Sequence, residues 1–312
     1  FKYNIEPGDW KKGVMREPPK NYTTYEYRNE VGSFRRSFDI PATWDGKEVY
    51  LNFDGVDSFF YLWINGRYVG FSKNSRNTAR FDISPYINKG KNEIAVEVYR
   101  SSDGSFLEAQ DMFRLPGIFR NVSVTATPKL HVADVKAIPA YTDGKGTVSL
   151  NTTLQNLTAK TAKDLHIRWS LYKNRLFADD NELVATFEDA KAKTTCNSKG
   201  QAAIRQTLTV DNVAAWTVEA PNVYVVVGEL MQGKKVLETI SFQTGFRTVE
   251  IKDTPASQDE FGLAGRYYYI NGKPVKLKGV NRHDTNPLTG KVISREQMEH
   301  EIMLMKRANI NH

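Results

Sequence analysis

The feature that most constrains the fold is a long series of short segments in which apolar and polar residues alternate, separated by turn signals. In EIAVEVY, residues 93–99, Ile94, Val96 and Val98 fall on one side and Glu93 and Glu97 on the other. A period of two is typical of a β-strand with one buried face.

A hairpin is predicted within the aromatic-rich segment YLWINGRYVGF, residues 61–71, where Asn65–Gly66 separates two apolar runs. This dipeptide tolerates the positive φ angles of a two-residue turn. Together with the alternation, it predicts an antiparallel β-sandwich over residues 33–127.

Strand-like segments continue over residues 130–247, spaced by Gly, Asp, Asn and Lys. They are LHVADVKAI, GTVSLNTTLQN, DLHIRWSLY, AAIRQTLTV, NVYVVVGEL and KVLETISFQTGF. About seven short strands in a region of this length favour an immunoglobulin-like sandwich. His166 lies inside one of them and is interpreted as a sheet residue.

After residue 248 the pattern becomes that of a βα unit. A strand is predicted up to Val280, followed by a polar loop and the helical segment SREQMEHEIMLMKRANIN, in which Ser294 and Gln297 form a capping-box start. A βα barrel needs about 250 residues, so we expect only the start of a truncated (β/α)8 barrel here. Catalytic groups lie at the carboxyl ends of barrel strands, which makes His283 a candidate; a surface loop histidine is the alternative.

Composition limits the remaining function classes. The 312 residues suit two or three domains. The net charge is +7, but the basic residues are scattered singly and form no nucleic-acid-binding motif. No apolar run is long enough to span a bilayer, so neither nucleic acid nor a membrane is an expected partner. Cys196 is the only cysteine and lies in a polar stretch, which predicts a passive loop thiol. Nothing in the sequence indicates the compartment.

Four stretches, in this order and spacing, resemble the bacterial β-galactosidases of glycoside hydrolase family 2. They are YRNEVGSFRRSF, FDGVDSFFYLWINGRYVGFSKNSR, RSSDGSFLEAQDMFRLPGIFRNVSV, and QTGFRTVEI followed by INGKPVKLKGVNRHDTNPLTG. The resemblance implies a jelly-roll sugar-binding domain over 1–128, an immunoglobulin-like sandwich over 129–247 and the start of the catalytic TIM barrel over 248–312.

The resemblance also implies a retaining hydrolysis of terminal β-D-galactosides by two glutamates. Both would lie beyond His312, so no catalytic residue is expected in this segment, and we expect the chain alone to be inactive. Its role would be to scaffold the active site and bind galactose. The full-length protein could form a homo-oligomer.

Three residues match the family's sugar-binding positions: Asn29, Asp111 and His283. Their amide, carboxylate and imidazole groups can each pair with a sugar hydroxyl, and the resemblance implies that they face one pocket. It further implies a sodium ion at Asp111 and a magnesium ion at Asp103, although Lys73 stands where a glutamine ligand of that magnesium is expected. The alternatives are a turn residue for Asn29 and a surface carboxylate for Asp111.

Two other functions stay open at this point. A β-glucuronidase or β-mannosidase of the same family would keep different residues in the LEAQDMF and GVNRHDTNPLTG loops, and a glucuronidase would need a cation for its substrate's carboxylate. A non-catalytic carbohydrate-binding β-sandwich fits the aromatic density but gives no reason for the βα unit.

Overall fold

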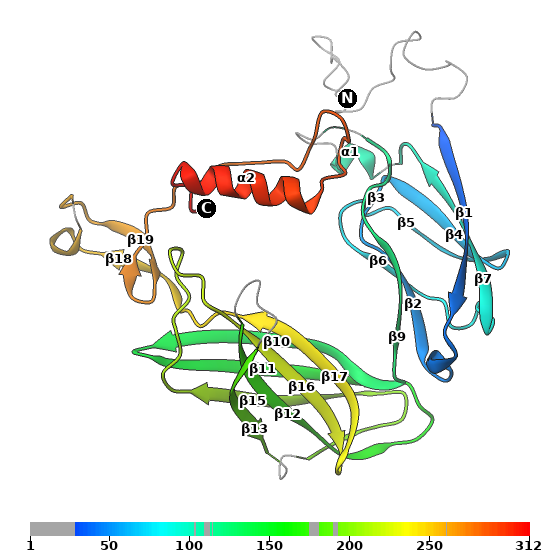
Figure 1. Cartoon of the computed structure of the whole chain (residues 1–312), viewed down its shortest axis with the longest axis horizontal. Helices are drawn as coiled ribbons and strands as arrows, with labels where there is room; N and C mark the ends of the chain where they lie inside the picture. The colour runs from blue at the N-terminus through cyan, green and yellow to red at the C-terminus, as the bar shows by residue number, and fades with distance from the viewer. Residues whose placement is uncertain are drawn as a thin grey trace, which may run out of the picture. The chain divides into compact units, whose positions relative to one another are not determined.

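The computed structural model describes residues 29–102, 104–108, 113, 115–174, 181–189, 193–259 and 261–312. Antiparallel strands dominate, and they belong to two compact units (Figure 1). The N-terminal unit comprises Phe1–Thr127 with Val280–Ala308, and the central unit comprises Pro128–Gly279 with Asn309–His312. None of the helices in the described ranges has the length and apolarity to cross a membrane.

The N-terminal unit is a β-sandwich of the jelly-roll type. Its larger sheet has the order β1 (Val31–Ile40), β7 (Gly90–Tyr99), β4 (Phe59–Ile64) and β5 (Arg67–Ser72). The facing sheet has the order β6 (Ala79–Asp82), β2 (Glu48–Phe53) and β9 (Val122–Thr127), and β3 (Val56–Asp57) pairs with β8 (Gly117–Ile118). Short helical turns are η2 (Ala42–Trp44) and α1 (Ser105–Glu108).

The core of this sandwich follows the predicted alternation. On β4, the residues Phe60, Leu62 and Ile64 are buried while their neighbours face outward, and on β7 the side chains of Val96 and Val98 are buried. Burying one face of each sheet against the other supplies the main driving force for this layer.

The predicted hairpin at Asn65–Gly66 is confirmed. Both residues have positive φ, 52° and 75°, as a type I′ turn requires. The Asn65 side chain also bonds outside the turn: its Nδ2 donates to the Tyr86 carbonyl at 2.9 Å, and its Oδ1 accepts from the Glu93 amide at 2.9 Å. Asparagine therefore both tolerates the turn conformation and fixes the hairpin to β7.

The central unit is an immunoglobulin-like sandwich followed by a small sheet. One sheet has the order β10 (Leu130–Thr142), β11 (Lys145–Asn156) and β15 (Gln201–Val210). The other has the order β13 (Glu182–Glu188), β12 (Ala162–Asn174), β16 (Val223–Gln232) and β17 (Lys235–Thr244), with β14 (Thr194–Cys196) also paired to β12. The small sheet has the order β18 (Val249–Thr254), β19 (Gly265–Ile270) and β20 (Lys273–Pro274), and η3 (Ala256–Gln258) lies between β18 and β19.

Trp169 on β12 is the largest fully buried side chain of the central unit. Its indole nitrogen donates to Gln206 Oε1 at 2.8 Å, so burial leaves no unpaired donor. His166 lies on the same strand, as predicted, and its Nε2 is 3.3 Å from Glu188 Oε1.

Two strands of this sandwich, β13 and β14, were not among the predicted segments. In β13 the alternation is short, with Ala185 and Phe187 packed on the core. Cys196 ends β14 and is fully buried, so its prediction as a loop residue is wrong. The residues around Cys196 are polar, and a three-residue strand with one inward-facing side chain is too short to show an alternating pattern.

The predicted strand ending at Val280 is not formed. The described residues 275–280 make only scattered backbone bonds, among them Asn311 N to Lys278 O at 2.9 Å. A parallel barrel strand needs a paired neighbour along its length, and here only the last residues of the chain lie beside it.

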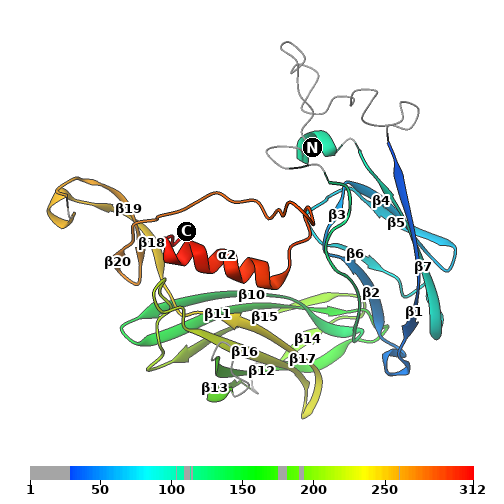
Figure 2. The same ribbon diagram turned by 45° about the horizontal axis from the view of Figure 1, so that its top comes forward.

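The predicted helix forms as α2 (Arg295–Arg307), and the backbone amide of Gln297 donates to the Ser294 hydroxyl at 3.2 Å, which is one half of the predicted capping box. The Gln297 side chain bonds Asn286 and Glu301 instead of reaching back to the Ser294 amide. None of its residues is buried. Figure 2 shows the preceding loop reaching β3 of the same unit before α2 begins.

Candidate functional site

His283 is exposed and borders a cavity of about 240 Å³ in the N-terminal unit. It lies in the segment that leads to α2, which we call the His283 loop and define as residues 281–293. The cavity is lined by residues from the sandwich, the His283 loop and α2, namely Arg76, Phe119, Arg120, Arg282, His283, Asp284, Lys291, Ile293 and Met298.

The residues flanking His283 are anchored to each other and to α2. The Arg282 guanidinium bonds Asp284 Oδ1 at 2.5 Å and Glu301 Oε2 at 2.9 Å. Glu301 also accepts from Gln297 Nε2 at 2.8 Å. His283 thus lies between two residues whose side chains are already engaged.

The far end of the His283 loop contacts the sandwich. The Lys291 ammonium forms an ion pair with the Asp57 carboxylate of β3 and lies 5.5 Å from the centre of the Phe119 ring. Beside it, Gly290 has φ +66°, and a Cβ there would lie 2.9 Å from Leu115 Cδ1. Both the backbone conformation and the close approach therefore favour glycine at 290.

Each of the four cations that line the cavity has a partner. Besides the pairs of Arg282 and Lys291, Arg76 Nη1 lies 3.8 Å from Glu108 Oε2. Arg120 Nη1 donates to the carbonyls of Asp54 at 3.2 Å and Arg76 at 2.9 Å. Three of these four cations are therefore paired with a carboxylate, and the bonds of Arg120 go to neutral carbonyls.

Asn29 lies two residues before β1 and is exposed. Its Nδ2 donates to the Ser101 carbonyl at 3.0 Å, and its Oδ1 accepts from the Ser101 amide at 2.8 Å. Both polar ends of the side chain are therefore occupied by backbone, and Asn29 is not among the residues that line the cavity beside His283. A role in sugar binding would require these two bonds to open or to be shared.

Asp111 and Asp103 lie outside the described residues, so the convergence of Asn29, Asp111 and His283 stays a prediction. The described part of the chain contains no cluster of three or more His, Cys, Asp or Glu side chains able to hold a metal ion. The sodium site at Asp111 and the magnesium site at Asp103, which the resemblance implies, therefore stay predictions.

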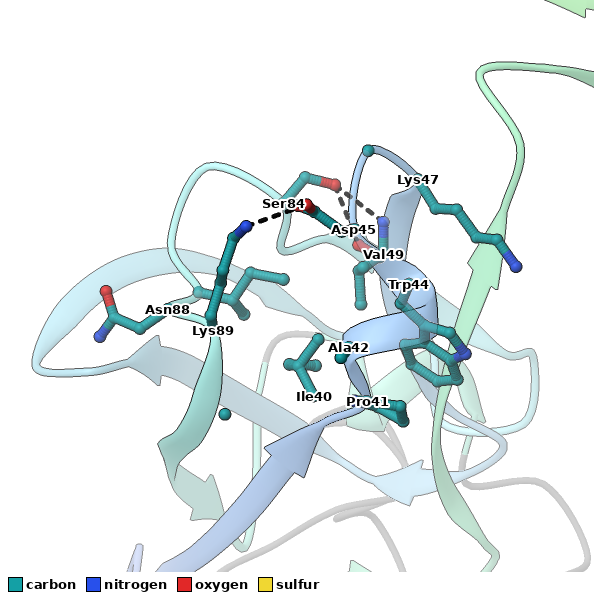
Figure 3. Close-up of a pocket in the computed structure, with 13 residues that line it drawn as sticks. Ile40, Pro41, Ala42, Trp44, Asp45, Lys47, Val49, Ser84, Asn88 and Lys89 are labelled. Carbon is teal, nitrogen blue, oxygen red and sulfur yellow. Dashed lines mark hydrogen bonds and ion pairs between the residues drawn. The ribbon is translucent and has the colours of Figure 1, made fainter.

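A second hollow, of about 450 Å³, lies at another end of the same sandwich between η2 and the turn before β7 (Figure 3). Its polar groups pair with each other: Lys89 Nζ bonds Asp45 Oδ2 at 2.9 Å, and the Ser84 hydroxyl accepts from the Val49 amide at 2.8 Å. It holds none of the predicted site residues.

The ion pair of Asp57 with Lys291, at the far end of the His283 loop, was not predicted from the sequence. Their only signals are a carboxylate that follows a buried strand in FDGVDS and a cation that follows a glycine in TGKV. The two residues are 234 positions apart, so no local pattern could pair them.

Three family models match the chain in succession. The sugar binding domain of glycosyl hydrolases family 2 matches residues 16–128, and the TIM barrel domain of the same family matches 262–312. Between them, the model described simply as glycosyl hydrolases family 2 matches residues 130–247.

Relatives named β-galactosidase align with almost the whole chain. The protein from Priestia megaterium is 38% identical over 308 residues, which is 97% of this chain and 27% of the relative. The β-galactosidase large subunit of Leuconostoc lactis is 30% identical, over 97% of this chain and 45% of the relative. The chain thus spans about a quarter to a half of the length of these relatives.

Solved structures of the family share the fold. A family 2 glycosyl hydrolase from Bacteroides cellulosilyticus superposes with a TM-score of 0.75 at 26% identity, covering 90% of this chain and 36% of that one. A Bacteroides uniformis β-glucuronidase gives a TM-score of 0.72 at 23% identity, over 88% of this chain and 32% of that one, which is a likeness of fold alone. Because three successive domain models of the family match the chain and relatives align with 97% of it, this chain belongs to glycosyl hydrolases family 2.

Proposed function

We propose that this chain is the amino-terminal part of a retaining β-galactosidase, in which it scaffolds the active site and contributes to galactose binding. Its strongest support is the 38% identity to a β-galactosidase across 97% of the chain. In the proposed enzyme, two glutamates beyond His312 act as nucleophile and acid/base, about 5 Å apart across the scissile bond.

His283 is the described residue with the strongest case for touching the sugar. It is exposed beside a cavity, and a neutral imidazole can donate one hydrogen bond and accept another, which suits a sugar hydroxyl. Asp111 and Asn29 complete the proposed set of galactose ligands, and Asp111 is the proposed sodium ligand.

The charge of the cavity favours a neutral sugar over a uronic acid. A glucuronide carboxylate is best held by a cation free to form charge-assisted hydrogen bonds. Arg76, Arg282 and Lys291 each have a carboxylate partner within the protein, and Arg120 donates to two carbonyls. Because three of the four cations are already paired with carboxylates, a β-glucuronidase is the less favoured alternative. Charge does not separate galactosides from mannosides.

The test is a substrate panel with the full-length protein and a His283→Ala variant. We expect hydrolysis of nitrophenyl β-D-galactoside in preference to the β-D-glucuronide and β-D-mannoside. In His283→Ala, kcat should fall more than KM rises, because the lost bond strengthens as charge develops at the sugar.

His300→Ala is the matched control, since His300 is exposed on α2 and does not line the cavity. Preference for the glucuronide or the mannoside would contradict the galactoside assignment. Equal effects of the two histidine variants would remove His283 from the proposed sugar ligands.

A further inference from the structure

We infer that Asp57 and Lys291 form a positioning pair that holds the His283 loop against the N-terminal sandwich and thereby fixes His283 at its cavity. The catalytic consequence rests on the proposed function, whereas the structural one does not.

Both partners of this ion pair are largely buried. The side chain of Lys291 is 6% exposed and that of Asp57 is 14% exposed, whereas Asp284 and Glu301, the two partners of Arg282 in the same loop region, are 61% and 31% exposed. Lysine is almost never buried without a partner, because removing an ammonium from water is costly. Losing either residue would leave the other charge buried and unpaired, so the contact between loop and sandwich depends on both.

The anchored end and His283 are connected by a rigid turn. The backbone amide of Asn286 donates to the Gly290 carbonyl at 2.8 Å, and the Gly290 amide donates to the Asn286 carbonyl at 2.9 Å. Asn286 Oδ1 accepts from the Leu288 amide at 2.7 Å, and its Nδ2 donates to Gln297 Oε1 of α2 at 2.7 Å. A loop closed on itself in this way moves as one piece, so the position of Lys291 is transmitted along it.

The near end is held by Arg282, which bonds both Asp284 and Glu301. His283 is therefore placed by α2 on one side and, through the rigid turn, by Asp57 of β3 on the other. Asp57 is itself held by the sheet, since β3 pairs with β8. Anchors at both ends of the loop define the position of an exposed side chain better than one anchor does.

The test uses the full-length protein with Lys291→Met, and with the double variant Asp57→Asn/Lys291→Gln, whose two amides can still bond each other. Lys89→Met is the control, because it removes the same charge from an exposed pair, Lys89 with Asp45, in the same sandwich (Figure 3). Hydrogen exchange is followed for residues 284–293 and for β7, and kcat and KM are measured with a β-galactoside.

In Lys291→Met we expect faster exchange over 284–293 with β7 unchanged, and a fall in kcat by on the order of 100-fold with a smaller change in KM, the cost of misplacing a group by about 1 Å. The double variant should recover most of the exchange protection and of kcat, and Lys89→Met should behave as the unmodified protein. If Lys291→Met does not fold, the same measurements on the double variant decide, with protection and kcat both close to those of the unmodified protein as the expected result.

Unchanged exchange over 284–293 in Lys291→Met would overturn the inference, as would equal acceleration in β7, which would make the pair a general stabiliser. A loosened loop with unchanged kcat would overturn its catalytic consequence. If the unmodified protein does not hydrolyse galactosides, the proposed function fails, and the exchange measurement still decides whether the pair holds the loop.

Discussion

At the scale of single residues, Gly228 on β16 is a glycine whose position leaves no room for a side chain. A Cβ at 228 would lie 2.4 Å from Trp169 Cζ3, and the indole ring is fully buried and bonded to Gln206. We expect Gly228→Ala to lower the free energy of unfolding by about 1–3 kcal/mol, the usual cost of overpacking a core. Denaturant unfolding measures this.

The control for that substitution is Gly265→Ala at the start of β19, where the nearest atoms lie at 3.3 Å on the outer end of the partly exposed Tyr267 ring, so a small shift of this ring makes room for the methyl group. It should change the free energy of unfolding by no more than about 0.5 kcal/mol. A Gly228→Ala protein as stable as Gly265→Ala would show that the packing around Trp169 is looser than described.

Cys196 gives a pH-dependent prediction. Burial raises the pKa of its thiol above the ordinary value, because the low-dielectric core disfavours the thiolate. The folded chain therefore keeps the proton at a pH where the unfolded chain releases it, so stability falls as pH rises through the ordinary thiol pKa. In Cys196→Ser this fall should be smaller, although the variant should be less stable overall.

The measurement is chemical denaturation of both proteins from about pH 7 to 10, with thiol labelling alongside. Native Cys196 should resist a thiol reagent at neutral pH and react only on unfolding. Rapid labelling of the folded chain would contradict the burial of this side chain.

At the scale of elements, α2 is a helix supported by its cap more than by packing. None of its residues is buried, and Ser294 accepts the Gln297 amide at its start. We expect Ser294→Ala to speed hydrogen exchange in the first turn, in line with a cap worth about 1 kcal/mol. Because the effect is local, exchange in β7 should not change.

Ser294→Asp is the matched control, since aspartate also accepts at an N-cap and its charge suits the helix N-terminus. Exchange in Ser294→Asp should be as slow as in the unmodified chain. If Ser294→Ala exchanges no faster than Ser294→Asp, the cap does not support α2.

The elements predicted correctly from the sequence are those whose structure is determined by residues close together in the chain. The hairpin at Asn65–Gly66, the alternation on β7 and the cap at Ser294 are set by neighbours in sequence, and all three are confirmed. The strand predicted up to Val280 failed because pairing decides whether a strand forms. The Asp57–Lys291 contact could not be predicted, because it joins two segments that only the fold brings together.

At the scale of the whole molecule, changes in residue period along the chain predicted an antiparallel sandwich, an immunoglobulin-like sandwich and the start of a βα barrel, and the family resemblance made the first of these a jelly roll. This succession agrees with the three family models. The site was less predictable than the fold. His283 became a candidate because it follows the expected end of a barrel strand, whereas the charges around it come from distant segments. The boundaries of the third domain stay a prediction, since residues 280–308 group with the N-terminal unit and 309–312 with the central unit.

The central claim is that this chain belongs to a retaining β-galactosidase, and the anomer first released tests it most directly. Retention forms a glycosyl-enzyme intermediate and returns the starting configuration. Proton NMR of the full-length protein with a nitrophenyl β-D-galactoside should show β-galactose first and the α-anomer only as mutarotation proceeds. The isolated 312-residue chain should release neither. α-Galactose as the first product, or turnover of the galactoside by the isolated chain, would contradict the account.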